Sequence, residues 1–144
     1  MISGQRIKVI FDTNIWISYL IGHQLSELSE LLISQKIELV LSKQLKTELI
    51  LVTERKKFQK YFNRKKVGQL LKLLDFIGSY YEVREYPNIC RDPKDNFLLG
   101  LIKASQANFL VTGDQDLLVL NPFEGTEIIE PNQLIKKIAL SDTV

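Results

Sequence analysis

The sequence predicts an α/β protein with three layers (α/β/α), in which a central parallel sheet of four to five strands lies between two layers of helices. Short apolar runs alternate along the chain with stretches of helical periodicity, and the first run stops abruptly at a polar turn. Buried strands of parallel sheets read as continuous apolar runs, and right-handed crossovers place helices on both faces. The length of 144 residues, with 45% hydrophobic and 25% charged residues, fits a single domain, 1–144.

The first strand and the turn after it occupy residues 7–16, and Asp12 ends the strand. Helical spacing over 14–20 predicts a helix that Gly22 ends, and apolar residues at 25, 28, 31 and 32 predict a second one. Residues 37–41 form a short strand. Ser42 is a plausible N-cap for the next helix, whose apolar residues recur at i, i+4 and i+7 (Leu45, Leu49 and Val52).

The second half of the chain continues the alternation. A helical stripe over 67–77 ends at Gly78, and strands are expected at 80–83, 107–111 and 127–129. Asp92-Pro93 is a good helix start, because Asp caps and Pro suits the first helical position. A short helix over 117–120 and a terminal helix that begins at Pro131 and carries Leu134, Ile135 and Ile138 complete the prediction.

Composition excludes several classes of protein. The longest apolar run, 97–102, has six residues, so no membrane helix is expected, and the apolar patch at the N-terminus is too short for a signal peptide. The single cysteine, Cys90, allows no internal disulfide, which suits the cytoplasm. The only histidine, His23, rules out histidine-pair ribonuclease and Ser-His-Asp chemistry, and no Gly-rich phosphate loop is present.

One stretch is strongly basic although the net charge is only +2. Seven Lys or Arg residues fall within 55–66: Arg55, Lys56, Lys57, Lys60, Arg64, Lys65 and Lys66. Phe58, Tyr61 and Phe62 are interleaved with them, so this basic segment is a candidate RNA-binding face with aromatic rings for base stacking. The alternative is a solvated helix and loop whose aromatic residues pack in the core or at a hinge.

Acidic residues mark the expected carboxyl edge of the sheet. Asp12 and Asp114 each follow a predicted strand, and ligands of such sheets bind beyond the strand ends where the strand order reverses. Asp95 heads the core-facing stripe of its helix. Glu48 falls on the apolar face of its own helix, unless that helix is rolled so that the carboxylate lies at the rim beside Lys43.

Such a cluster requires a counterion. Two carboxylates about 4 Å apart repel by roughly 4 kcal/mol at an effective dielectric of about 20. The candidate ligands are all oxygen atoms, which favours Mg²⁺ or Mn²⁺ over zinc. Simpler interpretations remain open, because Asp92, Asp114 or Asp116 can act as a helix cap and Asp95 can interact with a helix dipole.

Four motifs in order resemble the PIN-domain family, in particular the toxins of toxin–antitoxin pairs. They are Phe-Asp-Thr-Asn at 11–14, Glu48 in a helix that opens with Ser42, Arg-Asp-Pro-Lys-Asp-Asn-Phe-Leu-Leu at 91–99, and Val-Thr-Gly-Asp-Gln-Asp-Leu-Leu at 111–118. The resemblance spans about residues 7–135. It implies a compact α/β/α fold and metal-dependent cleavage of RNA.

The resemblance also implies the residues of the site. The family's catalytic and metal-binding acids correspond to Asp12, Glu48, Asp95 and Asp114, with Asp116 as a frequent extra metal ligand and Asn14, Asp92 and Thr112 in secondary positions. The implied reaction is hydrolysis of an RNA phosphodiester to 5′-phosphate and 3′-hydroxyl ends. An antitoxin protein and a homodimer are the implied partners, and the basic segment matches no family motif.

Two other functions compete with the nuclease. A catalytically silent PIN-like module would bind RNA or a protein, although it would have little reason to keep four costly acids. A phosphatase or phospho-acceptor domain would also place an Asp after the first strand. The phosphatase lacks its second acid because Asn14 stands there, and the phospho-acceptor lacks the Lys expected after a late strand.

Overall fold

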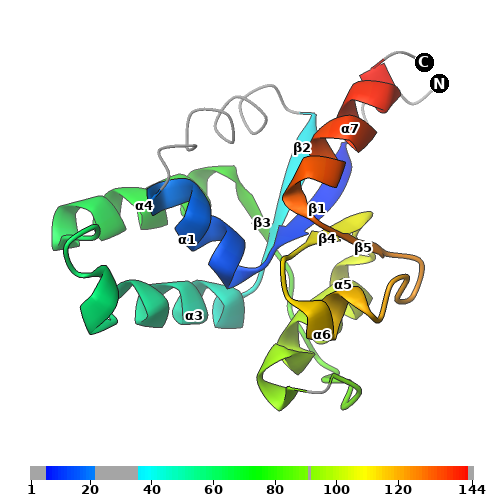
Figure 1. Cartoon of the computed structure of the whole chain (residues 1–144), viewed down its shortest axis with the longest axis horizontal. Coiled ribbons are helices and arrows are strands. Elements are labelled where there is room, and N and C mark those ends of the chain that lie inside the picture. The colour runs from blue at the N-terminus through cyan, green and yellow to red at the C-terminus, as the bar shows by residue number, and fades with distance from the viewer. Residues whose placement is uncertain (1–5, 22–35, 91, 143–144) are drawn as a thin grey trace.

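A five-stranded parallel sheet forms the centre of the protein (Figure 1). The computed structural model describes residues 6–21, 36–90 and 92–142. The strands lie in the order β3-β2-β1-β4-β5, so the chain reverses its direction of winding next to β1. Their bounds are β1 Ile7–Phe11, β2 Ile37–Leu41, β3 Gly78–Tyr80, β4 Phe109–Val111 and β5 Glu127–Ile129.

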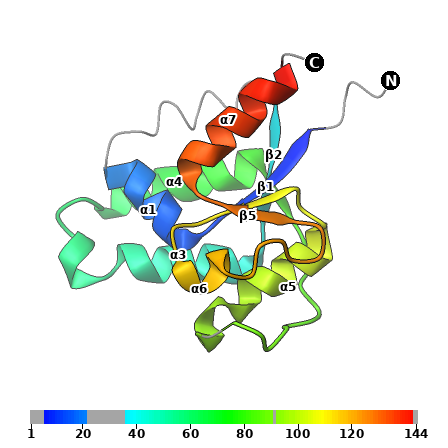
Figure 2. The same ribbon diagram turned by 45° about the vertical axis from the view of Figure 1, so that its right-hand side comes forward.

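Helices cover both faces of this sheet. Figure 2 shows α1, α4 and α7 on one side of the strands, and α5 and α6 on the other. The α-helices are α1 Thr13–Ile21, α3 Lys43–Thr53, α4 Arg64–Ile77, α5 Asn96–Ser105, α6 Gln115–Leu118 and α7 Pro131–Asp142, and two 3₁₀ helices are η1 Lys56–Phe58 and η2 Pro93–Asp95. The predicted three-layer α/β fold with a parallel sheet is therefore confirmed.

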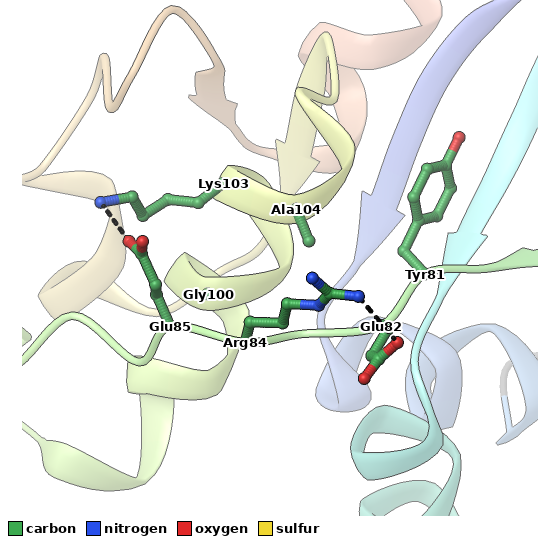
Figure 3. Close-up of a pocket in the computed structure, with 7 residues that line it drawn as sticks. All are labelled: Tyr81, Glu82, Arg84, Glu85, Gly100, Lys103 and Ala104. Atoms are coloured by element: carbon green, nitrogen blue, oxygen red, sulfur yellow. Dashed lines mark ion pairs between the residues drawn. The ribbon is translucent and has the colours of Figure 1, made fainter.

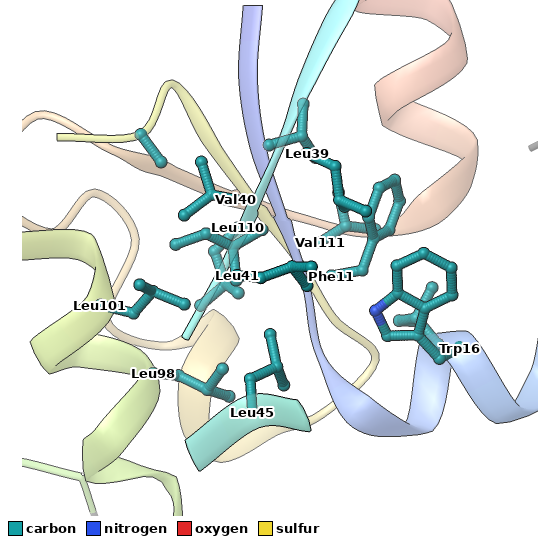
Figure 4. Packing of buried hydrophobic residues seen from close by; sticks show 14 of the residues in the cluster. Phe11, Trp16, Leu39, Val40, Leu41, Leu45, Leu98, Leu101, Leu110 and Val111 are labelled. Carbon is teal, nitrogen blue, oxygen red and sulfur yellow. The ribbon is translucent and has the colours of Figure 1, made fainter. Parts of the chain in front are cut away.

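The core forms because alternate residues of each strand point to opposite faces. Val40 and Leu110 point toward Leu98 and Leu101 of α5, whereas Phe11 points toward Trp16 of α1, whose ring centroid lies 5.6 Å away (Figure 4). Both faces are apolar, as parallel sheets require. Trp16 is completely buried and belongs to this core.

Several predicted elements are shifted in the structure. Strand β3 begins at Gly78, two residues before the predicted strand 80–83, because Gly78 both ends α4 and pairs with Leu39. A Cβ atom at Gly78 would collide with the side chain of Leu41, so only glycine permits this direct transition. Strand β4 is shorter than 107–111. Of the three apolar residues named for α7, Leu134 and Ile138 are buried and Ile135 is half exposed.

The connection between β3 and α5 crosses α5 at a close approach (Figure 3). A Cβ atom at Gly100 would lie 2.5 Å from the carbonyl oxygen of Glu85 and 2.7 Å from Cγ1 of Val83. Glycine at this position therefore allows the 81–86 segment to lie directly on α5. Lys103 Nζ adds an ion pair with Glu85 Oε2 at 3.0 Å.

Two expectations concern residues outside the described ranges. The predicted second helix at 25–32 lies there, and so does His23, the only histidine. Among the helices that the structure describes, none is long and apolar enough to cross a bilayer.

Candidate active site

The site is built where β1 and β4 end side by side. Asp12 follows β1, and its N–H donates to the carbonyl of Val111 at 3.0 Å. Thr112 follows β4, and its Oγ1 donates to Asp12 Oδ2 at 2.7 Å. The same Oγ1 accepts from the Asp114 N–H at 3.0 Å. A buried threonine hydroxyl therefore joins two predicted site residues that are far apart in the sequence.

The Asp12 carboxylate is buried, with 6% of its residue surface exposed. Burial raises its pKa, and the charge of Asp114 raises it further. Hydrogen bonds from Thr112 and from the backbone N–H groups of Asn14 and Thr13 act in the opposite direction. Asn14 thus reaches the site through its backbone at the start of α1, and this residue is exposed.

Asp95 is the most perturbed acid of the site. Burial, a hydrogen bond with Asp114, and the charges of Asp114, Asp12 and Asp92 raise its pKa to about 7. Its Oδ2 atom is buried and has no hydrogen-bond partner among the described residues. Asp95 makes no side-chain capping bond to α5, so a simple capping role does not account for its position.

Asp114 has two roles in the structure. Its Oδ1 accepts from the Asp116 N–H at 2.9 Å, so it caps the short helix α6, as the simpler interpretation predicted. Its charge nevertheless acts on both Asp12 and Asp95. Asp116, two residues further on in the first turn of α6, is half-buried. Asp12, Asp95 and Asp114 therefore form one electrostatically coupled group, which we call the acid cluster.

Asp92 is a cap, and its neighbours supply contacts that the sequence did not reveal. Its Oδ1 accepts from the Lys94 N–H at 3.1 Å at the start of η2. The buried Asn96 accepts from the Cys90 N–H at 2.9 Å, and Cys90 Sγ lies 3.7 Å from the carbonyl oxygen of Asp116. Burial raises the pKa of the Cys90 thiol. These contacts tie the loop before Asp95 to α6.

Glu48 lies outside the acid cluster. Leu45, Leu49 and Val52 are buried on α3, whereas Glu48 is only half-buried, which matches the alternative of a helix rolled to place it at the rim. The proposed pairing with Lys43 does not occur, since the Glu48 carboxylate makes no hydrogen bond or ion pair with any described residue. Its role as a metal ligand stays a prediction.

The basic segment forms the connection between α3 and α4 together with the first turn of α4. All seven of its Lys and Arg residues are exposed. Phe58 and Phe62 pack against the core and against each other at 6.3 Å between ring centroids, so the packing interpretation is right for these two rings. Only Tyr61 is exposed, and Lys60 Nζ lies 5.0 Å from its centroid.

The chemistry of the acid cluster fits a hard divalent cation. Its donors are carboxylate oxygens, and the buried, unpartnered Oδ2 of Asp95 is an oxygen that a cation would satisfy. Burial and the neighbouring carboxylates raise the pKa values of Asp12 and Asp95, and a bound cation would oppose both effects. Within the described ranges, however, no three acidic, thiol or imidazole side chains form a ready-made metal site. Closing the cluster around an ion would therefore require side-chain movement.

The chain matches a known protein family over most of its length. The family model described as the PIN domain matches residues 8–116, most of the chain. The chain belongs to the PIN-domain family. It is also similar to the uncharacterized protein MJ1680 of Methanocaldococcus jannaschii, with 29% identity over 118 residues that cover 80% of this chain and 76% of that protein.

A solved structure supports the fold of this PIN domain. The crystal structure of PAE2754 from Pyrobaculum aerophilum aligns with a TM-score of 0.61 at 13% identity, over 93% of this chain and 90% of the other. At this identity the likeness concerns the fold alone. PIN domains are a family associated with metal-dependent nuclease activity. The toxin role predicted from the sequence stays a prediction.

Proposed function

We propose that this PIN domain is a metal-dependent endoribonuclease that hydrolyses RNA phosphodiester bonds. One observation carries the proposal: Asp12, Asp95 and Asp114 act on each other electrostatically at the carboxyl edge of the sheet, and Asp95 keeps a buried oxygen without a partner. A purely structural role would not require such costly burial of carboxylates.

Each residue of the site has a proposed part. Asp12, Asp95 and Asp114 would hold Mg²⁺ or Mn²⁺, and Glu48 would complete the site from α3. The bound ion would supply a Lewis acid that activates water and stabilises the leaving 3′ oxygen. Thr112 fixes the Asp12 carboxylate through its 2.7 Å hydrogen bond, which is the orienting contact that metal ligands need. Asp95 must lose its proton before it can bind an ion.

The test is incubation of the purified protein with a mixed RNA pool in Mn²⁺, in Mg²⁺ and in chelator, followed by chemical mapping of the cut ends. Hydrolysis by water leaves 5′-phosphate and 3′-hydroxyl ends. Attack by the RNA 2′-hydroxyl, which contaminating histidine-dependent ribonucleases use, leaves cyclic phosphates instead. Cleavage that persists in chelator, or cyclic phosphate ends, would contradict the proposal.

The partners follow from the same proposal. We propose an RNA substrate, a small antitoxin protein that covers the acid cluster, and a homodimer in the cytoplasm, as the resemblance to PIN toxins implies. Light scattering of the purified protein measures its oligomeric state. Growth arrest on induction of the wild-type protein, and none with Asp12→Asn, would support the toxin role.

A catalytically silent PIN module that binds RNA or a protein is the second candidate. Two observations favour it: Glu48 is half-buried and pairs with none of the described residues, and those residues form no ready-made metal site. The two candidates differ in one measurement. The silent module would bind RNA without cutting it in any metal.

The basic segment gives a separate prediction about RNA affinity. It begins beyond the outer end of α3, whose 11 residues span about 16 Å from the sheet edge. If it binds phosphates away from the cleaved bond, the triple variant Lys56→Gln, Lys57→Gln, Lys60→Gln should weaken RNA binding. The log–log dependence of affinity on salt should flatten by about 0.7 to 1 unit per lost contact.

A salt titration of RNA affinity measures this slope. The matched control is Lys136→Gln, which removes an exposed cation from α7 and should leave the slope unchanged. An unaltered slope in the triple variant would mean that the basic segment is only a solvated face.

A further inference from the structure

A cavity of about 470 Å³ lies at the carboxyl ends of β2 and β3 and has no part in the chemistry proposed so far. Three tyrosines from the end of β3 and the segment after it line the cavity, Tyr80, Tyr81 and Tyr86, together with Ser42 and Lys43 at the start of α3. Its volume is within the range of small-ligand sites, about 300 to 1,000 Å³. We call this cavity the tyrosine pocket.

Two of the three rings are held in place. Tyr80 donates its hydroxyl to Asp75 Oδ1 at 2.7 Å, and Lys46 Nζ lies 5.8 Å from the Tyr80 centroid. Tyr81 donates its hydroxyl to Glu38 Oε2 at 2.7 Å. A flat group that stacks on fixed rings loses little affinity to the ordering of side chains.

The rings and charges of the tyrosine pocket suit a nucleotide. Tyr80 is 42% exposed and Tyr86 is 55% exposed, so both offer aromatic surface to a ligand. Lys43 contributes an exposed cation at the rim. Glu82 is the acid that lines the cavity, and Arg84 Nη2 lies 3.6 Å from its Oε2 and offsets its charge (Figure 3). Base stacking on aromatic rings combined with basic contacts is how proteins bind single strands.

The tyrosine pocket is in line with the acid cluster along the sheet edge. Strands β3, β2 and β1 are neighbours, and Tyr80 pairs with Leu41. Tyr81, Ser42 and Asp12 directly follow these three strands. Because neighbouring strands are about 4.8 Å apart, the backbone of Tyr81 lies roughly 10 Å from that of Asp12. A strand bound at the acid cluster can therefore reach the tyrosine pocket within a few nucleotides.

We propose that the tyrosine pocket binds an unpaired base of single-stranded RNA next to the bond that is cut. The choice of RNA as the ligand rests on the proposed nuclease function, whereas the geometry of the pocket does not depend on it. A duplex would not enter, because its bases are stacked on each other and expose only their edges. The domain therefore selects single-stranded substrates.

Binding is measured on an Asp12→Asn parent in chelator, so that no RNA is cut, by fluorescence anisotropy with labelled oligouridylate and oligoadenylate. Added Tyr86→Ala should raise the dissociation constant about 5- to 100-fold, because one stacked base is lost. Tyr86→Phe keeps the ring and should bind like the parent. Phe76→Ala is the matched control, because this ring is 88% exposed on α4 outside the pocket.

The outcomes separate this inference from the nuclease proposal. Four results would each overturn the proposed role of the tyrosine pocket. Tyr86→Ala could bind RNA as tightly as the parent, or Tyr86→Phe could lose as much affinity as Tyr86→Ala. Phe76→Ala could lose as much affinity as Tyr86→Ala, or the parent could bind no RNA. Wild-type protein that cuts no RNA, while Tyr86→Ala alone loses binding, would refute the nuclease and leave the tyrosine pocket supported.

Discussion

Replacement of Asp12 by asparagine is expected to lower the rate of RNA cleavage by more than about 100-fold. Loss of a residue that merely orients a metal ligand costs about 10- to 100-fold, and Asp12 is proposed as a ligand itself. Asparagine has nearly the same shape and can still accept the Thr112 hydroxyl, so the change removes charge rather than packing. The rate is measured on the same RNA pool with Mn²⁺.

Two variants of Thr112 provide the comparison. Thr112→Val removes the hydroxyl that joins Asp12 and Asp114, and we expect a loss of about 10- to 100-fold. Thr112→Ser keeps the hydroxyl and should retain most activity. If Asp12→Asn keeps more than about a tenth of the wild-type rate with its fold intact, Asp12 is not a metal ligand in the reaction.

The second large effect concerns the stability of the metal-free protein. The folded pKa of Asp95 is about 7, above the unfolded value of about 3.9, so the folded state binds the proton more tightly. The free energy of unfolding therefore falls as pH rises between these two values. Asp95→Asn should remove this slope and stabilise the metal-free protein at about pH 8 by something on the order of 1 kcal/mol, after allowance for solvent screening.

Thermal melts at about pH 5 and about pH 8, in chelator and with Mg²⁺, measure both effects. In the wild type, Mg²⁺ at 100 times its dissociation constant should add about 2.7 kcal/mol, or roughly 8 to 10 °C in Tm, and only at the higher pH. The rise should shrink in Asp12→Asn and Asp114→Asn. A shared metal site would be refuted if both variants melt below the wild type in chelator and if metal does not raise the Tm of the wild type.

Asp75 provides the matched control for the pH dependence. Hydrogen bonds from Lys46 and Tyr80 lower its pKa, which is the reverse of Asp95. Its contribution to stability is present above the unfolded pKa and is lost only as pH falls through the lower folded value. Asp75→Asn should therefore destabilise the protein equally at about pH 5 and about pH 8.

The sequence predicted the sheet well because buried parallel strands carry a strong local signal. The run of residues from Ile7 to Phe11 and its abrupt polar end identified β1, and strand adjacency then implied that Asp12 and Asp114 would meet. The Ser42 cap was also correct, since its Oγ accepts from the Leu45 N–H at 3.1 Å. These features depend on a few neighbouring residues.

Features that depend on exact rotation or on distant contacts could not be predicted in this way. A small roll of α3 decides whether Glu48 lies on the apolar face or at its rim, and helical periodicity does not resolve it. The sequence pattern predicts that Gly78 ends a helix. Its place in β3 depends on the close approach of the Leu41 side chain to the Gly78 backbone, which the pattern does not show. Asn96 was part of a recognised motif, but its bond to Cys90 depends on the fold of the preceding loop.

The pairing of β1 with β4 also determines when the acid cluster can assemble during protein synthesis. Asp12 and Thr112 are 100 residues apart, although their side chains share a hydrogen bond. At a translation rate of about 5 to 20 residues per second, roughly 5 to 20 s separate the synthesis of these two residues. Until β4 has emerged, β1 has no neighbour on one side and Asp12 has no Thr112 or Asp114 beside it. The acid cluster can therefore form only after the chain has been synthesised through Thr112 and Asp114.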